Sequence, residues 1–176
     1  MTTKNGKRSR AHVEVIAATR EEESVLANLL ELYAHDFSEF RELELGADGR
    51  FGYKHLSLYW REEGRHPFLV RMDGRLAGFA LVKRGSEVSA DETAWDLAEF
   101  FIMRAYRRRG VGTGVAHKVW RLLPGRWEVR VMESNRAACE FWESAISGFT
   151  GKRIRSTRFE KTGGAWRIFA FEAGKL

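Results

Sequence analysis

The sequence is poor in cysteine, with Cys139 as the single thiol among 176 residues. One cysteine cannot form a disulfide bond within the chain, which fits a reducing compartment. No segment approaches the ~20 consecutive apolar residues that a membrane-spanning helix requires. The first residues also lack the apolar stretch of a secretion signal. We therefore expect a cytoplasmic protein that does not contact a membrane.

Two further patterns are missing. The five histidines are scattered, and none has metal-ligand spacing to the cysteine or to a second histidine. We therefore expect no metal cofactor. No Ser-His-Asp pattern is visible either, and Cys139 falls in the middle of a predicted helix, where a small buried residue is a better interpretation than a nucleophile.

The charge balance is mildly basic, with 30 Lys and Arg against 24 Asp and Glu and a formal net charge of +6. Such an excess can attract a polyanion, and it can equally serve a phosphorylated cofactor or remain on a solvated surface. No nucleic-acid-binding motif is recognisable, so a nucleic-acid partner ranks last. Residues 1–10 are polar, basic and aperiodic, which predicts a disordered tail followed by a single domain over residues 11–176.

Hydrophobic periodicity and turn signals predict alternating strands and helices. Strands are expected at 12–17, 68–72, 76–83, 95–103, 127–131, 152–160 and 165–171, with Asp73-Gly74 as a two-residue hairpin turn. Helices are expected after Thr19, at 53–63, at 111–123 and from Asn135 to about residue 146. This order predicts an α/β fold with a mixed sheet.

The segment Y-R-R-R-G-V-G-T-G, residues 106–114, joins a predicted strand directly to a predicted helix. Glycines let main-chain amides approach a ligand closely, and amides at a helix N-terminus attract anions. The segment therefore predicts a site for a phosphate or pyrophosphate group.

Other interpretations of this glycine-rich turn compete with that site. A P-loop is excluded, because Gly112 is followed by Thr113-Gly114 rather than by lysine and a hydroxyl residue. A dinucleotide-binding turn is weak, because Val115 stands where the third small residue is needed and most strands precede the turn. A helix start with surface arginines and no ligand stays open.

Two motifs in this region resemble those of a known family. Arg107-x-x-Gly110-x-Gly112 is similar to the Q/R-x-x-G-x-G/A motif of the GCN5-related N-acetyltransferase (GNAT) superfamily. Residues 135–142, N-R-A-A-C-E-F-W, resemble the family's N-x-x-A-x-x-F-Y helix. The resemblance covers residues 13–171 and implies a GNAT-type fold, with a mixed, mostly antiparallel central sheet, a splayed strand pair and flanking helices.

The resemblance also implies acetyl-CoA as co-substrate. The backbone of the strand before the turn would contact the pantetheine arm and thioester, and the amides of the turn would hold the pyrophosphate. Asn135 would contact the coenzyme, act as a helix N-cap, or do both. The implied coenzyme-binding residues are Phe100, Phe101, Ile102, Arg107, Arg108, Arg109, Gly110, Val111, Gly112, Thr113, Asn135 and Trp142.

Acetyl transfer to an amine needs a general base, and Asp96 and Glu99 are the candidates. Asp96 matches the position of the base in histone-acetylating relatives. Glu99 stands among apolar neighbours, where desolvation would raise its pKa. Residues three apart on a strand face opposite sides unless a bulge intervenes, so at most one should reach the acceptor. A surface ion pair is the alternative for each, and Glu128 is a third candidate.

The sequence departs from the family at two positions of the site. Trp142 stands where many relatives have the tyrosine that is thought to protonate the coenzyme thiolate, and an indole N–H cannot replace that phenol as an acid. Water or another group would then act, or no acid is needed, or catalysis is impaired. Arg130 stands where many relatives carry a glutamate, five residues before the asparagine.

The expected function is transfer of an acetyl group from acetyl-CoA to a primary amine, by direct attack in a ternary complex. The acceptor is a small molecule, a peptide N-terminus or a lysine. Asp36 and Glu39 could attract the amine, or they form a solvated helix end. The alternative is a non-catalytic acyl-CoA-binding or sensing protein of the same fold. Dimers are frequent in the family, so a homodimer is compatible with the resemblance, and the oligomeric state stays open.

Overall fold

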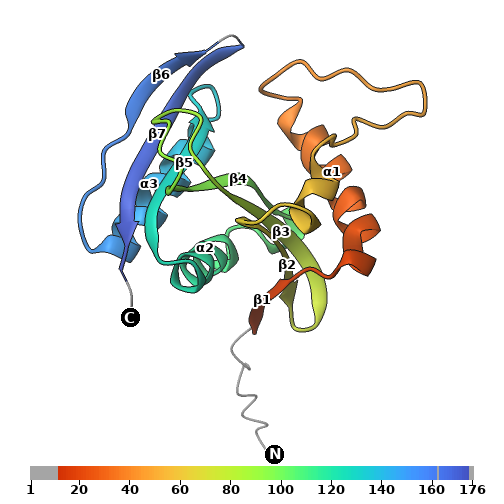
Figure 1. Ribbon diagram of the computed structural model, residues 1–176, viewed down its shortest axis with the longest axis horizontal. Helices are drawn as coiled ribbons and strands as arrows, with labels where there is room; N and C mark the ends of the chain where they lie inside the picture. The colour runs from red at the N-terminus through yellow and green to blue at the C-terminus, as the bar shows by residue number, and fades with distance from the viewer. Residues whose placement is uncertain (1–11, 162, 175–176) are drawn as a thin grey trace, which may run out of the picture.

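The computed structural model describes residues 12–161 and 163–174, and the predicted tail at 1–10 lies outside them. Figure 1 shows a twisted central sheet with helices on both faces. The strands are β1 (Val13–Ala17), β2 (Arg65–Met72), β3 (Arg75–Arg84), β4 (Trp95–Ile102), β5 (Gly125–Met132), β6 (Thr157–Lys161) and β7 (Gly164–Ala173). The α-helices are α1 (Glu23–Phe37), α2 (Val111–Leu122) and α3 (Arg136–Thr150), and short 3-10 helices are η1 (Arg20–Glu22), η2 (Leu56–Trp60) and η3 (Arg104–Tyr106).

The seven strands form one sheet in the order β1-β2-β3-β4-β5-β7-β6. Every neighbouring pair is antiparallel except β4 and β5, which run parallel. These two strands pair only through Trp95 with Trp127 and Asp96 with Glu128, after which β5 turns away from β4 (Figure 1). The expected fold class, a mostly antiparallel sheet with a splayed pair and flanking helices, is confirmed.

Two apolar clusters cover the two faces of the sheet. Helices α2 and α3 pack on one face, where Trp120 and Trp127 are fully buried. Helix α1 and η2 pack on the other face, where Leu26 meets Phe79 and Phe101. The long apolar strands β3 and β4 contribute side chains to both clusters, as strands in the middle of a covered sheet do.

Three segments differ in extent from the sequence prediction. The helix expected at 53–63 is wrong, because only η2 forms, and its buried residues Leu56 and Tyr59 are three apart, which suits the 3-10 period. Helix α3 runs on to Thr150 and ends at Gly151, whose φ of 67° gives a left-handed cap. Strand β6 begins at Thr157 rather than at residue 152 as a consequence.

A β-bulge in β4 decides which side chains reach the site. Leu81 pairs with Glu99 and the next residue of β3, Val82, pairs with Leu97, which leaves Ala98 as the extra residue. The exception named with the prediction therefore applies, and Asp96 and Glu99 do not face opposite sides of this strand. The bulge turns both carboxylates to the face that α1 covers. Within the described residues, no helix is long and apolar enough to cross a membrane.

Candidate active site

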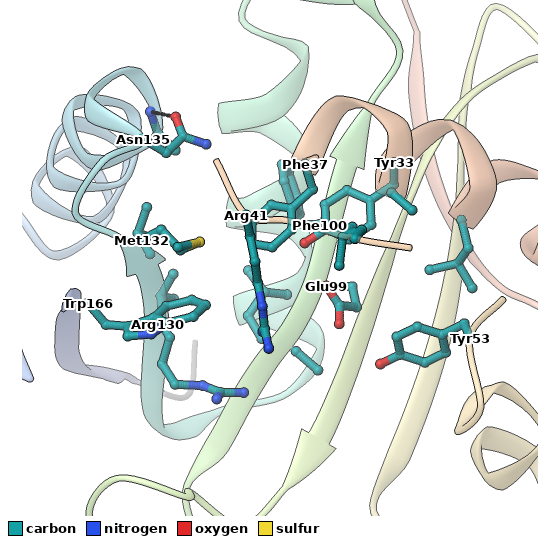
Figure 2. A pocket seen from close by; sticks show the side chains of 18 of the residues that line it. Tyr33, Phe37, Arg41, Tyr53, Glu99, Phe100, Arg130, Met132, Asn135 and Trp166 are labelled. Carbon is teal, nitrogen blue, oxygen red and sulfur yellow. Dashed lines mark hydrogen bonds between the residues drawn. The ribbon is translucent and has the colours of Figure 1, made fainter. Parts of the chain in front are cut away.

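A pocket of about 520 Å³ lies where β4 and β5 diverge, and Figure 2 shows side chains entering it from several elements. Tyr33 lines it from the α1 face of the sheet, whereas Ala138 and Trp142 line it from α3 on the opposite face. The splay thus opens a passage through the sheet. Aromatic side chains contribute to its wall from several elements, and they are Tyr33, Phe37, Phe51, Tyr53, Phe100, Trp142, Phe159 and Trp166.

Glu99 is the carboxylate of β4 that lines this pocket. Burial raises the pKa of Glu99 to about 7, because an ionised carboxylate loses solvation among apolar neighbours. The hydroxyl groups of Tyr33 and Tyr53, which face the carboxylate, and the charge of Arg130 act in the opposite direction. Glu99 therefore titrates close to neutral pH, where a general base works well.

Asp96 is close to Glu99 in sequence but lies outside the pocket and is only 1% exposed. The guanidinium of Arg130 binds both of its carboxylate oxygens, with Nη2 at 2.8 Å from Oδ2 and Nε at 3.3 Å from Oδ1. Lys83 adds a contact of 3.7 Å between Nζ and Oδ2. Burial raises the pKa of Asp96, and Arg130 opposes that rise. The ion pair and its burial separate Asp96 from any acceptor.

Glu128, the third carboxylate considered, is buried beside the paired start of β5. Ser86 donates a hydrogen bond to it, and Arg126 lies 3.6 Å away, measured from Nη2 to Oε1. Of the three carboxylates considered as bases, only Glu99 lines the pocket.

The junction between β4 and α2 has the geometry expected of an anion site. Gly110, the N-cap of α2, has a φ of 75°, and Arg108 also adopts a left-handed conformation, with a φ of 59°. The N–H of Gly114 donates a hydrogen bond to the carbonyl of Gly110, at 2.9 Å. The amides of the turn before it have no acceptor inside the helix, as at any helix N-terminus. They are the groups that could hold a diphosphate.

Gly112 has a second role at this junction. A Cβ atom at this position would lie 3.2 Å from ring carbons of Phe141, so glycine permits the close contact between α2 and α3. The neighbouring residues Val111 and Thr113 complete the first turn of α2, and the Val111 side chain is buried in the core.

The three consecutive arginines of the turn behave differently. Arg107 turns back toward the sheet, where its Nε donates to the carbonyl of Ile102 at 2.6 Å and its Nη2 contacts Asp36 at 2.6 Å. Arg108 and Arg109 are exposed. Asp36 also binds Arg104, at 2.7 Å between Oδ1 and Nη2, so this carboxylate is engaged by two arginines and is a poor amine site.

The remaining predicted coenzyme residues lie along the splay. Phe100, Phe101 and Ile102 follow the bulge, in the part of β4 that does not pair with β5. Asn135 accepts a hydrogen bond from the Ala138 amide at 3.0 Å, as a helix N-cap does, and also lines the pocket (Figure 2). Trp142 is 6% exposed and packs edge-to-face on Phe100, with ring centroids 4.9 Å apart.

The structure thus brings Glu99, Phe100, Asn135 and Trp142 to one pocket. The glycine-rich turn stands beyond the end of β4, outside that pocket. Sequence reasoning missed Tyr53 as a neighbour of Glu99, because this residue belongs to a loop without a local signal. In the part of the chain that the structure describes, no group of three His, Cys, Asp or Glu side chains could hold a metal ion.

Comparison with known proteins agrees with this architecture. The model of the acetyltransferase (GNAT) family matches residues 26–149, which is more than half of the chain. The chain belongs to the GNAT acetyltransferase family. Among curated proteins, none matches the sequence well enough to count as a relative.

Solved structures with the same fold include three informative ones. An acetyltransferase from Thermus thermophilus is 15% identical, with a TM-score of 0.66 over 91% of this chain and 96% of that one. The aminoglycoside acetyltransferase AAC(6')-Ib in complex with coenzyme A is 14% identical, with a TM-score of 0.68 over 92% and 95%. The putative acetyltransferase yncA from Salmonella typhimurium, with its cofactor acetyl-CoA, is 11% identical, with a TM-score of 0.64 over 93% and 95%.

Proposed function

We propose that this protein transfers an acetyl group from acetyl-CoA to a primary amine, with Glu99 as the general base. The observation that carries the proposal is the Glu99 carboxyl group, which lines the pocket at the splay with a pKa of about 7. Family membership supports the reaction class. Asp96 is the weaker candidate because its oxygens are held by Arg130.

The coenzyme would lie along the splay, with its thioester at the passage and its diphosphate at the start of α2. The free main-chain edge of Phe100 to Ile102 can bind the pantetheine arm, because β5 does not pair there. The amides of residues 108–113 can bind the diphosphate. Similar folds are known with coenzyme A and with acetyl-CoA bound, which supports this placement.

The chemistry then needs only groups that are present. Glu99 accepts one proton from the acceptor ammonium, directly or through a water molecule, and the amine attacks the thioester carbon. The tetrahedral intermediate collapses, the C–S bond breaks, and the second amine proton goes to the departing thiolate. Trp142 is packed in an aromatic cluster and is no acid, so the thiolate would receive that proton through water or directly from the amine.

The test is release of the coenzyme thiol with a panel of primary amines, together with calorimetry of acetyl-CoA binding. We expect turnover by the purified protein and a loss of about 10²–10⁴-fold in kcat/KM for Glu99→Gln. The affinity for acetyl-CoA should stay unchanged in that variant. Glu143→Gln, at an exposed position of α3, is the matched control and should behave as the unmodified protein.

Two outcomes would contradict the proposal in different ways. Binding of acetyl-CoA without acetylation of any amine would indicate the non-catalytic alternative, a sensing protein. Unchanged turnover in Glu99→Gln would be consistent with the acetyltransferase activity but would contradict the role of Glu99 as the general base.

A further inference from the structure

A second arginine borders the pocket, and the proposed reaction does not use it. Arg41 follows α1, and its side chain extends into the pocket in Figure 2. A Cβ atom placed on Gly163 would lie 3.9 Å from the Cζ and Nη2 atoms of Arg41. The guanidinium therefore reaches from the segment after α1 to the neighbourhood of Gly163, just before β7.

The two arginines of the pocket differ in what they bind. Arg130 contacts Asp96 at 2.8 Å and Glu87 at 3.3 Å, so its donors are occupied by carboxylates of the protein. Arg41 forms no ion pair within residues 12–161 and 163–174, although Glu44 of the same segment also borders the pocket. A guanidinium that faces a pocket without a protein carboxylate is a binding group for an anion.

The chemistry of the acceptor follows from this pair of opposite charges. Glu99 receives the ammonium of the acceptor under the proposed function, and Arg41 would repel a second cation. Aromatic side chains that line the same pocket, among them Phe37 and Trp166, fit an apolar skeleton. Resting on the proposed acetyl transfer, we infer that the acceptor is a small amine that also carries an anionic group, such as an amino acid with an apolar side chain, and that Arg41 binds that group.

This assignment separates the three acceptor classes that the sequence left open. A peptide N-terminus and a protein lysine carry no anionic group next to the reacting amine, whereas a free amino acid does. A polycationic amine is disfavoured because Arg41 lines the pocket and would repel its second positive charge.

The experiment compares amines in pairs that share a skeleton and differ in the anionic group. The pairs are phenylalanine with 2-phenylethylamine, leucine with 3-methylbutylamine, and tyrosine with tyramine, and the phosphonate analogue of phenylalanine distinguishes carboxylate from phosphate-like binding. In at least one pair, the amine with the anionic group should exceed the partner that lacks this group in kcat/KM by about tenfold or more, as a charged hydrogen bond contributes.

Arg41 variants then assign the preference to this residue. Arg41→Ala should lower kcat/KM for the anionic amine by about tenfold or more and leave its partner within about threefold. Arg41→Lys should retain part of the preference, since the charge remains without the planar fork. Arg61→Ala, at an exposed position after η2, is the control and should change neither substrate.

Calorimetry of the same amines on the protein with coenzyme A keeps the inference testable if turnover fails. Preferential binding of the anionic amine, lost in Arg41→Ala, would support Arg41 even where the proposed function fails. Equal loss for both members of a pair, a preference for the amines that lack the anionic group, or a change confined to the KM for acetyl-CoA would overturn the inference and leave acetyl transfer intact.

Discussion

Asp96 and Glu99 show how one strand, β4, serves two purposes. At the start of the strand, Asp96 lies between β3 and β5 and is clamped by Arg130. After the bulge at Ala98, Glu99 has β3 on one side and the pocket on the other. Both carboxylates face the same way, and burial raises the pKa of each. The difference between them is access, which the splay of β5 provides.

A raised pKa alone therefore does not identify a catalytic carboxylate, and the geometry around the group is needed as well. Asp96 and Arg130 form an ion pair that compensates both charges. Burial alone would lower the pKa of the Arg130 guanidinium, but the nearby carboxylates, Asp96 first among them, together have the larger effect and raise that pKa. Glu99 has phenol neighbours rather than a bound cation, so its charge can respond to a substrate. Variants at Asp96, at Glu99 and at nearby positions test this difference between the two carboxylates. We expect the largest change in stability for a variant of Asp96.

Asp96→Asn should be strongly destabilising, because it leaves the charge of Arg130 without its main partner in a partly buried site. We expect a loss of about 3–5 kcal/mol in the free energy of unfolding, measured by urea denaturation. The double variant Asp96→Leu/Arg130→Met removes both charges and should recover most of that stability. A loss below about 1 kcal/mol for Asp96→Asn would show that the ion pair is not what holds Asp96.

Glu99→Gln, in contrast to Asp96→Asn, should increase the free energy of unfolding. The pKa of Glu99 is raised from 4.5 to about 7, so the stability associated with its protonated form is present below pH 4.5 and is lost as pH rises through about 7. The variant should therefore gain up to about 3 kcal/mol relative to the unmodified protein between pH 5 and 8, less where solvent reaches the pocket. A constant difference across this range would contradict the raised pKa.

The arginines after β4 offer a smaller contrast. Arg108→Glu with Arg109→Glu should weaken acetyl-CoA binding by about tenfold at low salt, and less at high salt, because both side chains are exposed near the proposed diphosphate site. Calorimetry measures this affinity. The control is Arg121→Glu, at an exposed position in the last turn of α2. An unchanged affinity in the double variant would place the diphosphate elsewhere.

Trp142 should have the smallest effect on the chemistry. Its indole is packed against Phe100 and Phe141, and it supplies no proton in the proposed reaction. Trp142→Phe should keep kcat within about threefold, with the loss appearing in stability instead. If Trp142→Tyr raised kcat by more than tenfold, protonation of the thiolate would be the rate-limiting step. The unmodified protein would then lack the acid that this step needs.

Local signals in the sequence predicted the backbone conformation at the proposed coenzyme side of the site. The glycines of the turn and the N-cap Asn135 favour particular backbone conformations at their own positions. The starts of α2 and α3 could therefore be predicted from the local sequence. The hairpin turn at Asp73 and Gly74 follows the same logic, with φ values of 50° and 77°.

The acceptor side could not be predicted in the same way. The bulge at Ala98 depends on pairing with β3, and the clamp on Asp96 depends on Arg130 from the neighbouring strand. Tyr53 and Arg41 reach the pocket from a long segment after α1, whereas the sequence drew attention to Asp36 and Glu39 in this region and not to these two residues. Contacts between residues distant in the sequence decided which of two equally plausible carboxylates faces the pocket.

The role of Glu99 as general base is best examined by the pH dependence of kcat/KM for amine acetylation. We expect a limb that rises tenfold per pH unit and levels off near pH 7, where Glu99 loses its proton, and that is absent in Glu99→Gln. A rising limb with the same midpoint in Glu99→Gln would contradict it.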